Sequence, residues 1–195
     1  NKIVNRFKVD IGKRAVVRID TEQSPRDVWI SDKGMFKKMD IKKNPENYYS
    51  FSIGEEDLKV MKQFVGYLFT KIKNIGLVIL DGVVDLCEDY NDNKTSANLI
   101  KWLRRLNVKY NCILVDLLHN AKSTGLGRGF LGTESDNKSK IVIDSRQQFI
   151  MDVSTKKRVY SGNFELTFPS RRGGKAPQPA IYNFLEDGEI NFIHE

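Results

Sequence analysis

Residues 77–80 (Leu-Val-Ile-Leu) form an uninterrupted apolar run that is followed at once by Asp81 and Gly82. Such a run predicts a strand buried in a mostly parallel sheet, because an edge or half-exposed strand would alternate apolar and polar residues. In open α/β sheets the functional crevice lies beyond the carboxyl ends of the strands. Asp81 is expected there, where a carboxylate is suited to hold a hydrated Mg²⁺. The alternative is that Asp81 and Gly82 only begin a turn.

The first two thirds of the chain alternate between strand and helix patterns. Ser24 and Pro25 have the residue types of a helix N-cap and first helical position. Strands are expected at 14–20, 48–53, 77–80 and 112–117, and helices at 25–39, 55–73 and 95–110. This order implies right-handed crossovers and a parallel sheet.

The pattern changes near residue 141, after which no helical periodicity is found. Short strands joined by turns are expected at 141–144, 149–153, 163–168, 180–184 and 190–193. We interpret them as an antiparallel C-terminal extension of the same sheet. The predicted fold class is therefore α/β, with helices flanking a mostly parallel sheet. A chain of 195 residues fits one domain, with a parallel core at about 10–120 and the extension at about 140–195.

Composition narrows the class of protein further. Hydrophobic residues make up 40% and charged residues 29%, which excludes a disordered chain. No apolar run approaches the roughly 18 residues that cross a bilayer, and no signal-peptide core is present, so we expect a cytoplasmic protein without a membrane partner. Cys87 and Cys112 show no C-x-x-C spacing, which argues against a zinc site or disulfide framework; we interpret both as buried thiols.

Basic residues outnumber acidic ones, giving a net charge of +7, which indicates a polyanionic partner. Two clusters contribute. We interpret the first as a solvated helix end; it contains Lys33, Lys37, Lys38, Lys42 and Lys43. The second lies among glycines and contains Arg171, Arg172 and Lys175.

Four segments in order carry a resemblance. They are residues 18–24 (Arg-Ile-Asp-Thr-Glu-Gln-Ser), 77–86 (Leu-Val-Ile-Leu-Asp-Gly-Val-Val-Asp-Leu), 113–122 (Ile-Leu-Val-Asp-Leu-Leu-His-Asn-Ala-Lys) and 127–133 (Gly-Arg-Gly-Phe-Leu-Gly-Thr). From about residue 10 to 175 the chain resembles the RecA-like ATPase core. Within that family it is similar to the hexameric RepA-type and replicative-helicase branch found in plasmids and mobilizable transposons.

The resemblance implies roles for three residues. Glu22 matches the catalytic glutamate that polarises the water attacking the γ-phosphate of ATP, and Asp81 matches the Walker B aspartate that holds Mg²⁺. His119 matches a polar residue that senses the γ-phosphate and couples it to loops facing DNA. A lone histidine is otherwise more often a capping or core residue.

Three arginines are further candidates under the same resemblance. Arg128 lies in the glycine-rich segment 125–132, which resembles the mobile segment that lines the central channel or reaches the neighbouring subunit; a plain surface loop is the alternative. Arg171 and Arg172 lie where the family has a late Lys-x-Arg-x-Gly turn, whose arginine reaches the nucleotide of the adjacent subunit. Ser170 replaces the expected lysine, which leaves Arg172 the better candidate for catalysis and Arg171 a candidate nucleotide contact. A basic hairpin tip is equally compatible with these residues.

One family motif is absent from the sequence: G-x-x-x-x-G-K-S/T, the loop that cradles phosphates. Either the chain has lost it, or the protein is a relative that no longer hydrolyses ATP. Because the chain starts at Asn1 without methionine, and Ile3, Val4 and Phe7 have the pattern of a helix tail, we favour loss. We expect this chain alone to be inactive.

Two functions remain open on the sequence. The first is part of a RecA-like ATPase that uses ATP and Mg²⁺ and acts on DNA as a homo-oligomeric ring, in replication or mobilization of a mobile element. The second is a non-catalytic DNA-binding or interaction module on the same scaffold. Nucleotide binding by a Rossmann fold is disfavoured because no strand is followed by G-x-G-x-x-G.

Overall fold

The computed structural model describes residues 11–119, 129–172, 178–184 and 190–194. The chain divides into two compact units, Asp10–Asn137 and a second unit that contains Lys138–Glu195. The boundary coincides with the expected change from parallel to antiparallel structure. Within the described ranges, no helix has the length and apolar content needed to cross a bilayer.

The first unit contains a four-stranded parallel sheet, which confirms the predicted parallel arrangement, and its strand order is β2-β1-β3-β4. Its strands are β1 (Ala15–Asp20), β2 (Tyr48–Ser52), β3 (Ile75–Asp81) and β4 (Ile113–Leu117), and its helices are α1 (Pro25–Lys38), α2 (Leu58–Lys71), the short 3-10 helix η1 (Val83–Leu86), α3 (Asn93–Tyr110) and α4 (Gly129–Lys138). Asp20 and Asp81 are register partners in β1 and β3, so the carboxyl ends of these strands meet at one edge of the sheet.

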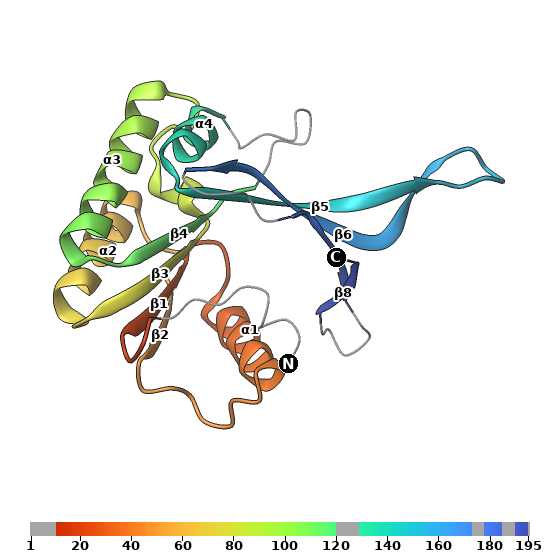
Figure 1. Cartoon of the computed structure of the whole chain (residues 1–195). Helices are drawn as coiled ribbons and strands as arrows, with labels where there is room; N and C mark the ends of the chain where they lie inside the picture. The colour runs from red at the N-terminus through yellow and green to blue at the C-terminus, as the bar shows by residue number, and fades with distance from the viewer. Residues whose placement is uncertain (1–10, 120–128, 173–177, 185–189, 195) are drawn as a thin grey trace. The chain divides into compact units, whose positions relative to one another are not determined.

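One face of this sheet forms the core. Val17, Ile19, Val78 and Leu80 point to this face and are almost fully buried. They pack in one apolar cluster with residues of α2 and α3, including Met61, Val65, Leu99 and Leu103. The apolar three- and four-residue spacing of α2 and α3 is what directs these side chains to the sheet. Figure 1 shows both helices on this side of the sheet.

Helix α1 lies on the opposite face. The Ser24 hydroxyl accepts a hydrogen bond from the backbone N–H of Asp27 and Pro25 opens the helix, which confirms the predicted start. From this face of β1, Arg18 donates hydrogen bonds to Ser31 and Asp32 of α1. Only Val28 and Asp32 of α1 are buried, so this helix is much less closely packed than α2 or α3.

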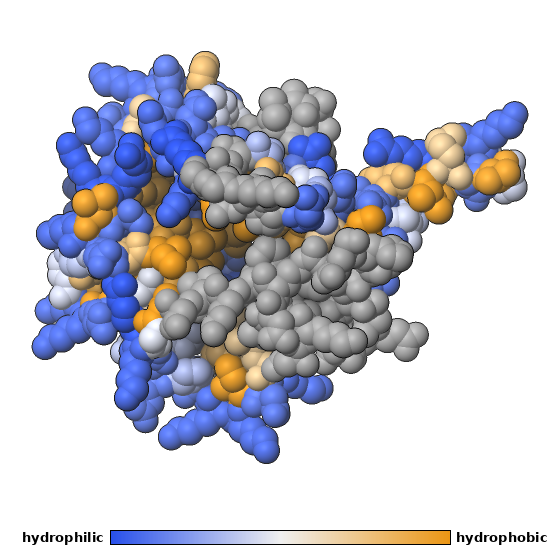
Figure 2. Space-filling view, in the orientation of Figure 1, coloured by the Kyte–Doolittle hydropathy of each residue, from blue (hydrophilic) through white to orange (hydrophobic). Residues whose placement is uncertain are grey.

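The prediction that residues 112–117 form a buried strand is wrong for most of its length. β4 is the last strand in the sheet order, and its side chains alternate between exposed and half-buried. Ile113, Val115 and Leu117 are 45%, 38% and 44% exposed, on the face opposite α2 and α3. Leu77 and Ile79 are their neighbours on this face of β3. Figure 2 shows apolar side chains, in orange, at the surface over this part of the sheet.

The second unit contains an antiparallel sheet with the order β5-β6-β7-β8, formed by β5 (Ile141–Met151), β6 (Arg158–Arg171), β7 (Ala180–Phe184) and β8 (Ile190–His194). The antiparallel pairing is confirmed, but the strands form their own sheet and do not extend the parallel one. The two short strands expected at 141–144 and 149–153 are one strand, because register shifts let β5 stay paired with β6 through its polar middle. Helix α4 was not predicted.

Candidate functional site

Glu22, Asp81 and His119 lie at or just after the carboxyl ends of three strands in the same sheet. Asp81 is the last residue of β3, Glu22 comes two residues after β1, and His119 comes two residues after β4. Since the strand order is β1-β3-β4 and all three strands run parallel, the structure brings the three predicted residues to one edge. We call this group the carboxyl-edge site.

Glu22 and His119 contact each other across this edge. The Nε2 atom of His119 lies 3.5 Å from the Oε2 atom of Glu22, and the two side chains are 83% and 41% exposed, respectively. A pair this exposed contributes little to folding stability. A carboxylate beside an imidazole, both open to water, can however accept, donate or orient a proton.

The turn that carries Glu22 is fixed by the turn after β3. Thr21 donates its backbone N–H to the carbonyl of Asp81 at 2.9 Å and its hydroxyl to the carbonyl of Gly82 at 2.8 Å. Gly82 has φ +90°, and a Cβ at this position would lie 2.1 Å from the Thr21 hydroxyl oxygen and 2.8 Å from the Cγ of Glu22. Only glycine allows the two turns to approach so closely.

Asp20 also holds the turn that carries Glu22. Its fully buried carboxylate accepts hydrogen bonds from the backbone N–H groups of Glu22 and Gln23, at 3.0 and 2.8 Å. Its second oxygen accepts from Arg18 at 2.8 Å. The backbone of Glu22 is therefore held by a buried charge, whereas its side chain is free to reach solvent.

Arg18 balances three carboxylates on this face of the sheet. Its guanidinium lies 2.8 Å from Asp20, 3.0 Å from Asp32 and 3.3 Å from Asp81. Burial acts to lower the pKa of Arg18, but the hydrogen bond to Asp32 and the charges of Asp20 and Asp32 outweigh it and raise the pKa. Arg18 is thus the cation that compensates the charges of Asp20, Asp32 and Asp81.

The environment of Asp81 disfavours its charged form. Burial raises the pKa of Asp81, the charge of Asp20 raises it further, and Arg18 opposes both. A cation close to Asp81 would relieve this penalty.

Asp81 and its surroundings fit a Mg²⁺ site in which the protein supplies a single carboxylate ligand. In the part of the chain that the structure describes, no three or more His, Cys, Asp or Glu side chains are arranged to hold a metal ion. Mg²⁺ beside a nucleotide needs only one or two carboxylates, because phosphates and water fill its other positions. Asp81 fits that role as a single ligand, and Arg18 keeps Asp20 and Asp32 as partners if it releases Asp81.

Three arginines were also predicted as site residues. Arg128 is outside the described residues. Arg171 ends β6 and Arg172 follows it, and both belong to the second unit. Arg172 is exposed, and its backbone N–H donates to the carbonyl of Lys140 at 2.8 Å. Glycines 129 and 132, expected in a mobile segment, belong to α4, where the Ser135 hydroxyl donates to Asp116.

Sequence reasoning missed Arg18, Asp20 and Thr21, which hold the carboxyl-edge site together. One signal was available: Arg18 and Asp20 are two residues apart in a strand and so share a face. Arg18, Asp20 and Thr21 belong to the same sequence segment as Glu22. Their partners Asp32, Asp81 and Gly82 are distant in the chain, so these contacts could not be assigned without the sheet order.

Comparison with known proteins found no family model that matches this chain, and no curated protein matches it.

Proposed function

We propose that this chain is part of a RecA-like ATPase that acts on DNA in replication or mobilization of a plasmid or mobilizable transposon. The observation that carries the proposal is the contact between Glu22 and His119, 3.5 Å apart at the carboxyl edge of a parallel sheet, with Asp81 on the strand between them. These are the three residues that the resemblance assigns to water activation, γ-phosphate sensing and metal binding.

Each residue has a distinct task in this proposal. Glu22 orients the water that attacks the γ-phosphate, and its exposed carboxylate above a fixed backbone suits that task. His119 contacts Glu22 and registers whether the γ-phosphate is present. Asp81 would hold Mg²⁺, which neutralises charge on the phosphates.

A phosphate-binding loop is needed besides these residues, and the sequence lacks its motif. Parallel sheets normally have both faces covered, and the exposed face of β4 with Ile113, Val115 and Leu117 offers a surface where a βα unit carrying such a loop would pack. We therefore expect this chain by itself to hydrolyse no ATP.

The test is ATP hydrolysis by the full-length gene product, with and without single-stranded DNA. Glu22→Gln keeps the size of the side chain and removes its charge, and should abolish hydrolysis while nucleotide binding persists. Glu46→Gln, just before β2 and therefore at the opposite edge of the sheet, is the matched control. Unchanged turnover in Glu22→Gln would remove Glu22 from the mechanism.

A second candidate function is a DNA-binding module without catalysis. It is favoured by the net charge of +7 and by Arg172, exposed directly after β6. It predicts salt-dependent DNA binding by this chain that is lost when Arg171 and Arg172 are replaced. Absence of binding to single- and double-stranded DNA at low salt would contradict it.

A further inference from the structure

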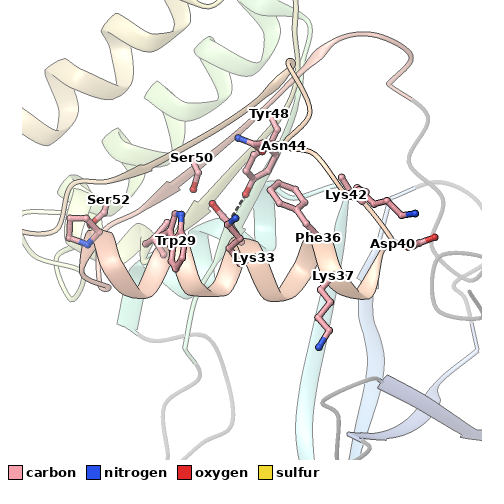
Figure 3. Close-up of a pocket in the computed structure, with 14 residues that line it drawn as sticks. Trp29, Lys33, Phe36, Lys37, Asp40, Lys42, Asn44, Tyr48, Ser50 and Ser52 are labelled. Carbon is pink, nitrogen blue, oxygen red and sulfur yellow. Dashed lines mark hydrogen bonds between the residues drawn. The ribbon is translucent and has the colours of Figure 1, made fainter.

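A groove of about 750 Å³ runs between α1 and β2 in the first unit. Its α1 wall includes Trp29, Lys33 and Phe36, and its β2 wall includes Tyr48, Ser50 and Ser52. Figure 3 shows Trp29 and Phe36 of α1 on the same groove as Ser50, Ser52 and Tyr48 of β2, with the rings of Phe36 and Tyr48 in contact. The groove exists because α1 buries only Val28 and Asp32 and so does not close onto the sheet edge.

Aromatic surface is available in this groove. Trp29 is 59% exposed, which is unusual for a side chain of this size. The rings of Phe36 and Tyr48 meet edge to face with their centroids 5.0 Å apart, so they form a fixed apolar wall. A planar aromatic ligand could stack on Trp29.

Positive charge accompanies the aromatic surface. Lys33, Lys37 and Lys42 line the groove, and the ammonium of Lys33 lies 5.2 Å from the centre of the Trp29 ring. Two acidic residues also line it, but Asp32 is paired with Arg18 and bonded by the Tyr48 hydroxyl at 2.8 Å. Asp40 is the other carboxylate of the lining, beside three lysines, and Figure 3 shows the Lys37 side chain directed away from β2.

The groove is longer than one nucleotide. Its lining on α1 extends from Pro25 to Lys37, which at 1.5 Å per residue is about 18 Å. One end reaches the carboxyl-edge site, because the Ser52 hydroxyl donates to the carbonyl of Gln23 at 2.6 Å and Gln23 follows Glu22.

We propose that the α1–β2 groove binds single-stranded nucleic acid, with a base stacked on Trp29 and backbone phosphates at Lys33 and Lys42. Stacking platforms combined with a basic groove are the physical means by which proteins bind unpaired strands. A duplex keeps its bases stacked on one another and offers Trp29 no base face. Three of the five lysines that the sequence analysis interpreted as a solvated helix end line this groove.

In the proposed DNA-linked ATPase this groove would bind the DNA strand, and in this respect the inference rests on the proposed function. Its test measures binding without ATP, so that failure of binding and failure of hydrolysis are distinguished.

The test is tryptophan fluorescence during titration of this chain with an oligothymidylate of about ten nucleotides. Trp102, the second tryptophan, is replaced by Phe so that the signal reports Trp29 alone. We expect saturable quenching, and a plot of log affinity against log salt with a slope of about −1.4 if two phosphates are contacted, at about −0.7 each.

Variants locate the site. Lys33→Glu with Lys42→Glu should weaken binding at least tenfold and remove about 1.4 from the salt slope. Trp29→Ala, measured by fluorescence anisotropy of a labelled strand, should weaken binding about tenfold. Lys59→Glu with Lys101→Glu, exposed on α2 and α3 on the other side of the sheet, is the control of equal charge and should bind as the unmodified chain does.

Three results would overturn the proposal: no quenching at low salt, equal affinity for a blunt duplex, or binding that survives both groove variants. Equal affinity for polyglutamate, with the same loss in the lysine variant, would also overturn it and assign the groove to an acidic peptide.

Discussion

The Nε2 atom of His119 lies 3.5 Å from the Oε2 atom of Glu22, although β3 separates the strands that carry the two residues. Both residues lie two positions beyond the ends of their strands, and their side chains meet across the carboxyl end of β3.

This contact predicts that Glu22 and His119 act as one unit. In the full-length gene product, His119→Ala should lower ATP turnover by about 10- to 100-fold, and Glu22→Gln with His119→Ala should be no worse than Glu22→Gln alone. Steady-state hydrolysis rates of the two single variants and the double variant check this. Losses that multiply in the double variant would show that the residues act independently.

Replacing Asp81, a candidate site residue, should increase the stability of the folded chain. Burial and the charge of Asp20 raise the pKa of Asp81, so its charged form costs more in the folded than in the unfolded chain. At pH 7, Asp81→Asn should therefore raise the melting temperature. The gain should disappear as the pH falls below the ordinary value of 3.8, where the carboxyl is protonated in both states.

Asp92 is the opposite case, because the folded structure lowers its pKa. It caps α3 by accepting from the backbone N–H of Thr95 at 2.7 Å, and this bond lowers the pKa of Asp92. Asp92→Ala should lower the melting temperature at pH 7, with an effect that fades as the pH falls through that lowered pKa. For the preceding prediction, a lower melting temperature of Asp81→Asn at pH 7 would contradict the conclusion that the folded chain disfavours the charged form of Asp81.

Tyr48 should ionise well above an ordinary tyrosine. Burial and the hydrogen bond to Asp32 raise its pKa from 10.0 to about 12. Ultraviolet titration should show one late phenolate step that is missing in Tyr48→Phe. Because the folded state holds the proton more tightly, stability should fall as the pH rises from about 10 to about 12. A titration in Tyr48→Phe identical to that of the unmodified chain would contradict this.

Gly82 should not tolerate a side chain. At φ +90°, a Cβ would lie 2.1 Å from the Thr21 hydroxyl oxygen, so Gly82→Ala should destabilise the chain by more than about 1 kcal/mol. Gly66 in α2 has no atom within 4 Å of an added Cβ, and Gly66→Ala should stabilise by up to about 1 kcal/mol. Chemical denaturation of both variants measures the difference, and equal effects would contradict it.

The sequence predicted the parallel unit well where local signals were strong. Ser24 and Pro25 marked the start of α1, and the apolar spacing of α2 and α3 marked their buried faces. β4 was predicted in position but not in burial, because an apolar run has the same composition in the interior of a sheet and at its edge. α4 was missed because its glycine- and serine-containing sequence has no apolar period.

Three residues of the carboxyl-edge site were predicted individually, but their arrangement in space was not. Glu22, Asp81 and His119 each follow a strand, which the pattern shows, whereas the contact between Glu22 and His119 depends on the order β1-β3-β4. The Arg18 network and the α1–β2 groove depend on how α1 lies against the sheet, which no local pattern encodes.

The measurement that tests the proposed function most directly is ATP hydrolysis by the full-length gene product and by its Glu22→Gln and Glu46→Gln variants, each with a parallel measurement of nucleotide binding. We expect Glu22→Gln to bind nucleotide and lose at least about 100-fold in turnover, while Glu46→Gln remains active. Full activity in Glu22→Gln, or no hydrolysis by the unmodified protein, would contradict an ATPase centre at the carboxyl edge of β1, β3 and β4.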